Sequence, residues 1–356
     1  MRLPISPGNG HGQTPSFGWM TILSLVISQL AGKVYGHIAP WHKGMYCLNG
    51  TNPGLDDEDT NAAVNPLFML NKTDWWFHHV NQCDEFPPAP GDFLELPANG
   101  NFTVELTTNR GFTTLSYNGT RTGIYDSGLV AAQEGKAPDD CITNPNIHTQ
   151  NETMAAGTAF AISYVSDLSE VTEDNLVVFT VLYHTPWERI ATYQVPNLPA
   201  CPEPEGCICA WGWVANGCGE PNMYMLPYRC RVTGQTGPSA VAKAVPPTWC
   251  ESDATNCTSG AKQLVYWNQL EGNNVFVSGF DLSGQPKSPG YNMKMGFKNG
   301  AQTDIFLSPG SATTTVIAPA PTATTPPAKA AASKAKTCTF FLLLPIIFSS
   351  VSIFHL

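Results

Sequence analysis

The stretch Asn101–Asn109, NFTVELTTN, carries the alternation that decides the fold. Phe102, Val104 and Leu106 fall on one face, as in a β-strand with one face buried. Similar short runs follow, separated by Gly, Pro, Asn and Asp: GTAFAISYV (157–165), NLVVFTVLYH (175–184), RIATYQV (189–195), KQLVYWNQL (262–270) and NVFVSGF (274–280). No stretch shows a clear helical period. Strands at this spacing predict an all-β protein built as a β-sandwich.

Cysteines suggest that long loops are fastened to this sandwich. The chain has 11, of which Cys338 lies in the apolar C-terminal tail, so ten remain for the folded part. An even number in a secreted chain predicts up to five disulfides, whose pairing the sequence leaves open. The Pro-rich stretches DEFPPAPGD (84–92) and CPEPEGC (201–207) are expected to be long ordered loops.

The N-terminal region has the pattern of a secretory leader. Residues 19–32, WMTILSLVISQLAG, are apolar but shorter than the roughly 20 residues of a membrane span. Met20 is an alternative start, and either start leaves the small residue Gly36 before His37. We therefore predict a signal peptide over residues 1–36 and a mature chain that begins with His37.

The C-terminal region carries a second targeting pattern. Small residues, a short polar spacer and the terminal tail TCTFFLLLPIIFSSVSIFHL (337–356) are typical of a GPI-anchor signal. A C-terminal membrane helix is the alternative, but no basic residues follow the tail. We predict one domain over 37–307, a Ser/Thr/Pro/Ala-rich linker over 308–332 and a removed tail over 333–356, with cleavage near residues 330–333.

Glycosylation signals and charge agree with an extracellular protein. Six sequons are present, at Asn49, Asn71, Asn101, Asn118, Asn151 and Asn256. Without leader and tail the chain has 14 basic and 28 acidic residues. This charge disfavours nucleic acid and other polyanions as partners, whereas neutral polysaccharide is compatible with it.

A histidine at a mature N-terminus is a potential chelator. The α-amine and imidazole of His37 offer two nitrogen donors, and one more imidazole completes a T-shaped set that suits Cu(II). The amine must lose its proton to bind, which its reference pKa near 8 permits at modest cost. The plainer interpretation is that His37 is only the first residue after cleavage.

The residues alone leave the second imidazole open. His42 is too close in sequence to fold back easily, and His184 follows a predicted strand, so a structural role is favoured for both. His78 and His79 lie among aromatic residues in DWWFHHVNQC (74–83), and His148 lies in a polar loop (139–153). Spacing does not choose between His148 and the pair His78 and His79.

Other motifs are weaker. The acidic run LDDEDTN (55–61) lacks the glycine and final glutamate of an EF-hand, so we interpret it as a solvated loop. Cys207 and Cys209 would suggest zinc in a reduced chain, but disulfides are favoured after a signal peptide. A carboxylate pair for glycoside hydrolysis has no fixed spacing and stays possible.

Several motifs in order carry a family resemblance. They are HIAPWHKGMY (37–46), DWWFHH (74–79), GDFLELPANGNFTVEL (91–106), VPNLPACPEPEGCICAWGW (195–213) and MYMLPYRC (223–230). Together they resemble the fungal copper-dependent lytic polysaccharide monooxygenases of auxiliary activity family 14. The resemblance spans His37 to about Cys230 and weakens beyond.

The resemblance implies an immunoglobulin-like β-sandwich with one copper ion held by a histidine brace. By order along the chain it implies His148 as the second copper histidine and Tyr224 as the axial tyrosine, with Tyr228 less favoured. It also implies hydrogen peroxide or dioxygen as co-substrate and an external electron donor. The implied substrate is an insoluble polysaccharide, with xylan on cellulose favoured and fungal wall glycans as an alternative.

Two other functions compete with oxidative cleavage. A histidine brace also suits a non-catalytic surface protein for copper uptake or sequestration, and a wall-associated structural glycoprotein would need no metal. For each we expect an extracellular monomer that meets the membrane only through its lipid anchor. Trp41, close to the terminus, either contacts a polymer or packs in the core.

Overall fold

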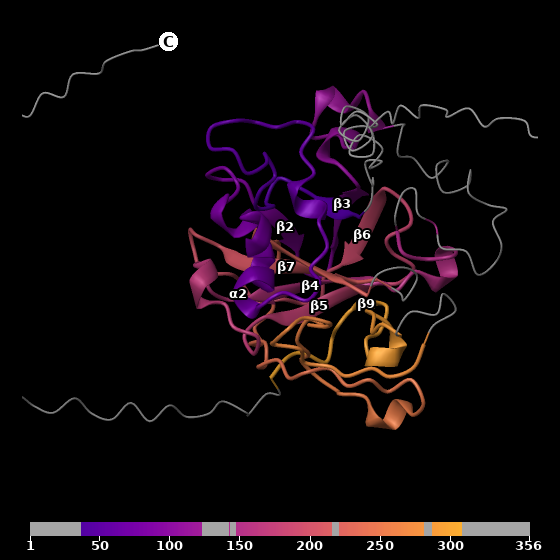
Figure 1. The fold of residues 1–356 in the computed structure, drawn as a ribbon. Coiled ribbons are helices and arrows are strands. Elements are labelled where there is room, and N and C mark those ends of the chain that lie inside the picture. The colour runs from indigo at the N-terminus through magenta and orange to yellow at the C-terminus, as the bar shows by residue number, and fades with distance from the viewer. Residues whose placement is uncertain (1–36, 123–141, 143–146, 216–220, 281–286, 308–356) are drawn as a thin grey trace, which may run out of the picture. The chain divides into compact units, whose positions relative to one another are not determined.

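The computed structural model describes residues 37–122, 142, 147–215, 221–280 and 287–307 (Figure 1). The predicted leader, linker and anchor signal lie outside these residues. Within the described part, no helix has the length and apolar character needed to cross a membrane.

Two β-sheets form the described fold. The larger has six strands in the order β2-β8-β7-β4-β5-β9, and the smaller has three in the order β1-β3-β6. Pairing is antiparallel except between β2 and β8. The strands are β1 (Ala39–Trp41), β2 (Leu94–Pro97), β3 (Asn101–Thr107), β4 (Thr158–Ser163), β5 (Val177–Leu182), β6 (Ile190–Gln194), β7 (Cys207–Val214), β8 (Met223–Thr233) and β9 (Gly300–Ala301).

Helical structure in the described part is short. One α-helical turn, α2 (Lys72–Trp75), leads into η2 (Trp76–Asn81), and the rest are single 3₁₀ turns in connecting segments. These are η1 (Ala62–Val64), η3 (Cys83–Glu85), η4 (Arg110–Phe112), η5 (Tyr117–Gly119), η7 (Glu152–Met154), η8 (Leu168–Glu170), η9 (Ala254–Asn256) and η10 (Met293–Met295). The prediction of an all-β sandwich is confirmed.

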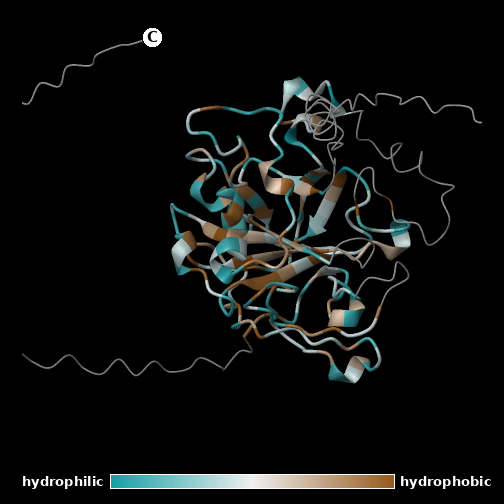
Figure 2. Ribbon diagram, viewed as in Figure 1, coloured by the Kyte–Doolittle hydropathy of each residue, from teal (hydrophilic) through white to brown (hydrophobic). Residues whose placement is uncertain are grey.

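The main core lies between the two sheets. The predicted inward face of β3 is buried, with Phe102, Val104 and Leu106 exposing 6%, 1% and 1% of their surface. Phe102 stacks on Tyr193 of β6 at 5.3 Å and meets Phe160 of β4 edge-on at 5.0 Å. Figure 2 shows hydrophobic residues concentrated on the central strands and hydrophilic ones in the outer loops.

The six-stranded sheet is covered on its other face as well. Leu264, Tyr266 and Tyr291, from the C-terminal part of the described chain, pack there in a second apolar cluster. Tyr291 approaches β7 so closely that a Cβ at Gly212 would collide with its hydroxyl. Every residue of β7 is therefore buried, as expected for a strand covered on both sides.

Two predicted strands are wrong. Residues 262–270 and 274–280 are irregular, apart from isolated bridges. Apolar side chains of residues 264–267 do cover the sheet, but the backbone there bonds to side chains: the Val265 N–H donates to the Tyr291 hydroxyl at 3.0 Å, and the Tyr266 N–H to Asn274 Oδ1 at 2.9 Å. Burial without ladder partners explains the strand-like pattern of that segment. In residues 274–280 the alternation has another origin, since Phe276 and Phe280 are 85% and 73% exposed.

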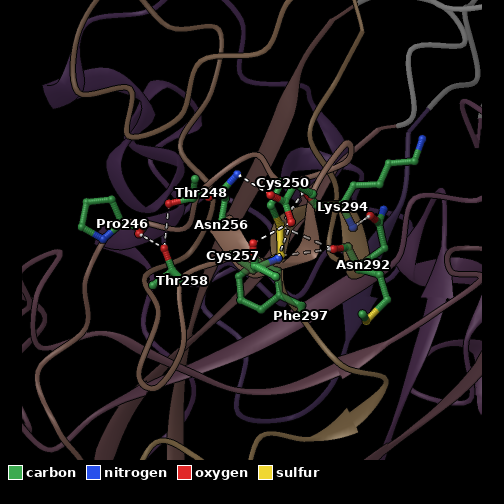
Figure 3. The surroundings of a disulfide bond; sticks show 12 residues. Pro246, Thr248, Cys250, Asn256, Cys257, Thr258, Asn292, Lys294 and Phe297 are labelled. Atoms are coloured by element: carbon green, nitrogen blue, oxygen red, sulfur yellow. Dashed lines mark hydrogen bonds between the residues drawn. A yellow bond between two sulfur atoms is a disulfide. The ribbon is translucent and has the colours of Figure 1, made fainter.

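Among the described residues, four disulfides fasten loops and strands, in line with the prediction of up to five. They are Cys47–Cys83, Cys201–Cys207, Cys209–Cys230 and Cys250–Cys257. Figure 3 shows Cys250–Cys257, where the Cys250 N–H donates to the Lys294 carbonyl at 2.8 Å. Cys141 and Cys218 lie outside the described residues.

Truncating the core between the sheets should destabilise the protein strongly. Phe160 is fully buried and touches rings from β3, β6 and β8. We expect Phe160→Ala to lower the free energy of unfolding by about 3–5 kcal/mol, because the cavity adds to the lost burial. Denaturant unfolding measures this. Ile190→Ala, at a position 48% exposed on β6, is the control and should change stability by less than about 1 kcal/mol.

Candidate metal centre

His37 lies two residues before β1, the first strand of the smaller sheet. β1 pairs with β3 in the register Ala39↔Thr107 and Trp41↔Glu105. Trp41 is 1% exposed, and its indole N–H donates to the Thr107 carbonyl at 3.1 Å. Trp41 thus packs in the core and holds the segment that follows His37; it is not a surface contact.

His148 sits in a loop tied down on both sides. Its neighbours Ile147 and Thr149 are buried, and the Ile142 N–H donates to the Thr149 carbonyl at 2.9 Å. The Thr149 hydroxyl donates to the Asn151 carbonyl at 2.8 Å. A loop that the sequence suggested was simply polar therefore presents His148 from a fixed backbone.

Tyr224 comes from β8, next to β7. The register of these strands places Tyr224 directly opposite Trp213, and the two rings stack at 4.5 Å with an interplanar angle of 19°. The Cys209–Cys230 disulfide crosslinks the same two strands. Both rings belong to the core cluster between the sheets.

Three of the predicted site residues come together. The rings of His37 and His148 stack at 5.1 Å with an interplanar angle of 20°, and the Tyr224 ring lies 5.9 Å from His37. Trp213 lies 5.8 Å from His148 and so touches both a histidine and the tyrosine. His148 and Tyr224 are each 2% exposed, and His37 is half-buried.

Both histidines have left-handed backbone. The φ angle is 90° at His37 and 48° at His148, a region that residues other than glycine seldom occupy. Such conformations cost free energy and concentrate at functional sites. The φ angle of a residue includes the carbonyl carbon of the preceding residue. A chain that began at His37 would therefore have no φ angle at this residue.

The other candidate histidines lie elsewhere. His78 is fully buried, and desolvation lowers its pKa to about 4. The His79 Nδ1 lies 2.9 Å from Asp84 Oδ2, and His184 is exposed beside Tyr183. His42 accepts the Gly44 N–H on its Nδ1 at 3.2 Å, a structural role.

The alternative tyrosine is also separate from the two histidine rings. Tyr228 is fully buried, packs edge-on against Phe160 and donates its hydroxyl to the Pro40 carbonyl. Tyr228 thus ties β8 to β1. Of the two tyrosines in MYMLPYRC, it is Tyr224 whose ring lies against His37.

Trp213 was not among the residues predicted for this site. Trp213 is the second tryptophan of the sequence CICAWGWV (207–214). This sequence has no polar–apolar alternation, because both faces of β7 are buried. The spacing of Cys209, Trp211 and Trp213 by two residues was the available signal, since it places all three on one face of a strand.

Comparison with known proteins identifies the class. The sequence pattern described as lytic polysaccharide monooxygenase AA14 matches residues 19–351. The chain is 33% identical over 294 residues to AA14 family lytic polysaccharide monooxygenase A of Trametes coccinea, an alignment covering 79% of this chain and 64% of that protein. It is 36% identical over 285 residues to a B-type member from Pycnoporus cinnabarinus, covering 76% and 70%.

A third relative is similar in length to this chain. Lytic polysaccharide monooxygenase B of Talaromyces rugulosus is 34% identical over 285 residues, covering 76% of this chain and 93% of the relative. The chain thus spans somewhat under two thirds of the Trametes coccinea A protein but nearly all of the Talaromyces one. This chain belongs to the AA14 family of lytic polysaccharide monooxygenases, a class of copper-dependent oxidoreductases.

The residues present fit copper. Two imidazoles 5.1 Å apart lie within reach of one ion, because a metal lies about 3 Å from the centroid of an imidazole that binds it at about 2.0 Å. Imidazole nitrogen suits copper, and a free α-amine at His37 would add a third nitrogen. The Tyr224 phenol, whose ring lies 5.9 Å from that of His37, would offer an oxygen near the same ion.

Histidine burial predicts a loss of stability in acid. Burial, and then the charge of Lys43, lowers the pKa of His42 to about 4, whereas an unfolded histidine has a pKa near 6.5. The unfolded chain therefore takes up the proton first, and the contribution of His42 is full above pH 6.5 and lost as pH falls toward 4.

We expect His42→Gln to remove this dependence. Between pH 7 and pH 5, metal-free wild-type protein should lose roughly 2 kcal/mol more unfolding free energy than the variant. Denaturant titrations at the two pH values measure the difference. Equal losses would show that His42 does not titrate in this way.

Proposed function

We propose that the mature protein starts at His37 and binds one copper ion through the α-amine and imidazole of His37 and the imidazole of His148, with Tyr224 on the axial side. The observation that carries the proposal is the stacked pair of imidazoles against the Tyr224 ring. Three segments far apart in sequence supply these side chains.

Cleavage before His37 is central to this proposal. It would free the α-amine, whose reference pKa near 8 makes deprotonation by a metal feasible, and would relax the left-handed φ of His37. The adjoining strand keeps the new terminus in place, since Ala39 pairs with Thr107.

The protein contributes position to the reaction. Copper, when bound and reduced by an external donor, supplies the activation of hydrogen peroxide or dioxygen that oxidises a carbon of the glycosidic linkage. The buried backbone around His148 fixes one imidazole, and the stack of Trp213 on Tyr224 fixes the phenol. The Tyr224 side chain would then limit which other ligands can approach the copper ion from the side of its ring.

We propose a neutral, insoluble polysaccharide as substrate, with xylan on cellulose favoured. The acidic net charge of the chain disfavours polyanionic polymers. If the chain is lipid-anchored, the glucans or chitin of the cell's own wall are the alternative.

We propose an extracellular, N-glycosylated protein held by a GPI anchor. Asn49, Asn71, Asn101, Asn118, Asn151 and Asn256 are all exposed, as glycan acceptors must be. Asn256 stands on the turn closed by Cys250–Cys257 (Figure 3). Asn151 lies three residues from His148, so a glycan there would border the metal centre and influence polymer access.

Copper sequestration without catalysis is the second candidate. The burial of His148 and Tyr224, each 2% exposed, suits retention of an ion better than contact with a polymer surface. An anchored protein is also poorly placed to diffuse into biomass. The two functions share the metal centre and differ only in turnover.

We expect His148→Ala to abolish copper binding at this centre, because a T-shaped set of three nitrogens would lose one arm. Electron paramagnetic resonance of copper-loaded protein, with the terminus established as His37 by mass spectrometry, should show an axial Cu(II) spectrum that the variant lacks. His184→Ala, at an exposed histidine beside Tyr183, is the matched control and should bind like the wild type.

An extra residue before His37 should damage the site as severely, since it converts the α-amine into an amide. Unchanged copper affinity in His148→Ala would refute this ligand set.

One assay distinguishes the catalytic function from copper sequestration. With a reductant and hydrogen peroxide, the copper-loaded protein should release oxidised oligosaccharides from xylan-coated cellulose, and His148→Ala should release none. Mass spectrometry of the soluble products measures this. Tight copper binding with no oxidised product from xylan, cellulose, glucan or chitin would favour sequestration.

A further inference from the structure

A second cluster of metal-ligating side chains lies apart from the proposed copper centre. His79, Asp84 and Glu85 bring one ligand atom each within 4.8 Å of one another. All three come from η2, η3 and the turn between them, a segment that supplies none of His37, His148 and Tyr224. We propose that these three residues form a separate surface site for a divalent first-row metal ion, and this proposal does not depend on the proposed function.

The distances suit a metal ion. His79 Nδ1 lies 3.0 and 2.9 Å from the two Asp84 carboxylate oxygens and 3.8 Å from Glu85 Oε1. Ligand atoms bound at about 2.1 Å are about 3.0 Å apart at a right angle and about 3.4 Å apart in a tetrahedron. The first two distances match the right-angle value, and Glu85, on an exposed side chain, is free to move the short way needed to complete the set.

The backbone already holds the ligands in this arrangement. Gln82 adopts a left-handed conformation and donates its N–H to the His79 carbonyl at 2.7 Å, and the Glu85 N–H donates to the Gln82 carbonyl at 3.0 Å. The neighbouring residues anchor the segment, since His78 is fully buried and Cys83 is bonded to Cys47. Little ordering is left for the metal to impose, which favours affinity.

The donor set indicates the class of ion. One imidazole nitrogen with two carboxylates suits Zn²⁺ or Cu²⁺, and Cu²⁺ is bound most tightly in the first-row order. Without metal, a hydrogen bond joins the imidazole Nδ1 and the Asp84 carboxylate. A bound ion would take the place of the proton in that bond. The side chains of His79 and Asp84 are 43% and 24% exposed, so ions reach them from solvent.

The test is a Cu²⁺ titration of purified, chelator-treated secreted protein. Calorimetry of the wild type should give two ions per chain, and His79→Ala should give one, with the remaining affinity unchanged. Asp84→Asn preserves the shape of the side chain, removes its charge and should weaken the second site at least tenfold. His184→Ala, at another exposed histidine, is the control and should keep both ions.

Spectroscopy separates this proposal from the copper centre. In His148→Ala, paramagnetic resonance should still detect Cu²⁺ coupled to one imidazole, and this signal should vanish when His79→Ala is added. A Zn²⁺ titration should show the same loss. One ion per chain in the wild type with a normal brace spectrum, or two ions in both His79→Ala and Asp84→Asn, would overturn the second site and leave the proposed function intact.

Discussion

The pairing of β7 with β8 is the constraint on which the metal centre depends. Its register sets Trp213 opposite Tyr224, and the Cys209–Cys230 disulfide crosslinks the two strands. A slip by one residue would turn the Tyr224 ring from the core between the sheets to the opposite face, which the C-terminal segments cover. The tyrosine therefore has one available position. Its stack on Trp213 gives the two histidine-bearing segments a fixed surface to pack against.

The histidines reach this surface by different means. His37 is carried by β1, whose short ladder with β3 is reinforced by the Trp41 indole and by the Tyr228 hydroxyl on Pro40. His148 depends on a loop whose neighbouring side chains are buried. A strand and a loop from distant parts of the sequence are brought together only by the complete sandwich. A loss of global stability should therefore disturb the pair of imidazoles before it disturbs either segment alone.

Residues with a local signature were predictable, and those that depend on tertiary contacts were not. Phe102, Val104 and Leu106 alternate because only one face of β3 is buried. β7 is buried on both faces, so its sequence lacks the polar–apolar alternation that identifies a strand. For the same reason Trp213 was not recognised as a residue of the site. Residues 262–270 show the reverse error, since they cover a sheet without joining its ladder. His148 could not be separated from His78 and His79 by spacing, because the approach of a loop to the terminus is set by the fold. The family resemblance supplied that choice.

Burial explains why neighbouring histidines differ in what they can do. His78 is sealed in the core with its pKa lowered to about 4, so it stays neutral and serves packing. His79, one residue on, faces solvent and two carboxylates, where an ion can replace the shared proton. The left-handed backbone at Phe77 and His78 turns the two side chains to opposite environments. The same conformation recurs at His37 and His148. His184 shares this backbone angle yet is exposed, and His79 lacks it, so in this chain the surroundings of each imidazole, and not its backbone angle, decide whether the ring is structural or a potential ligand.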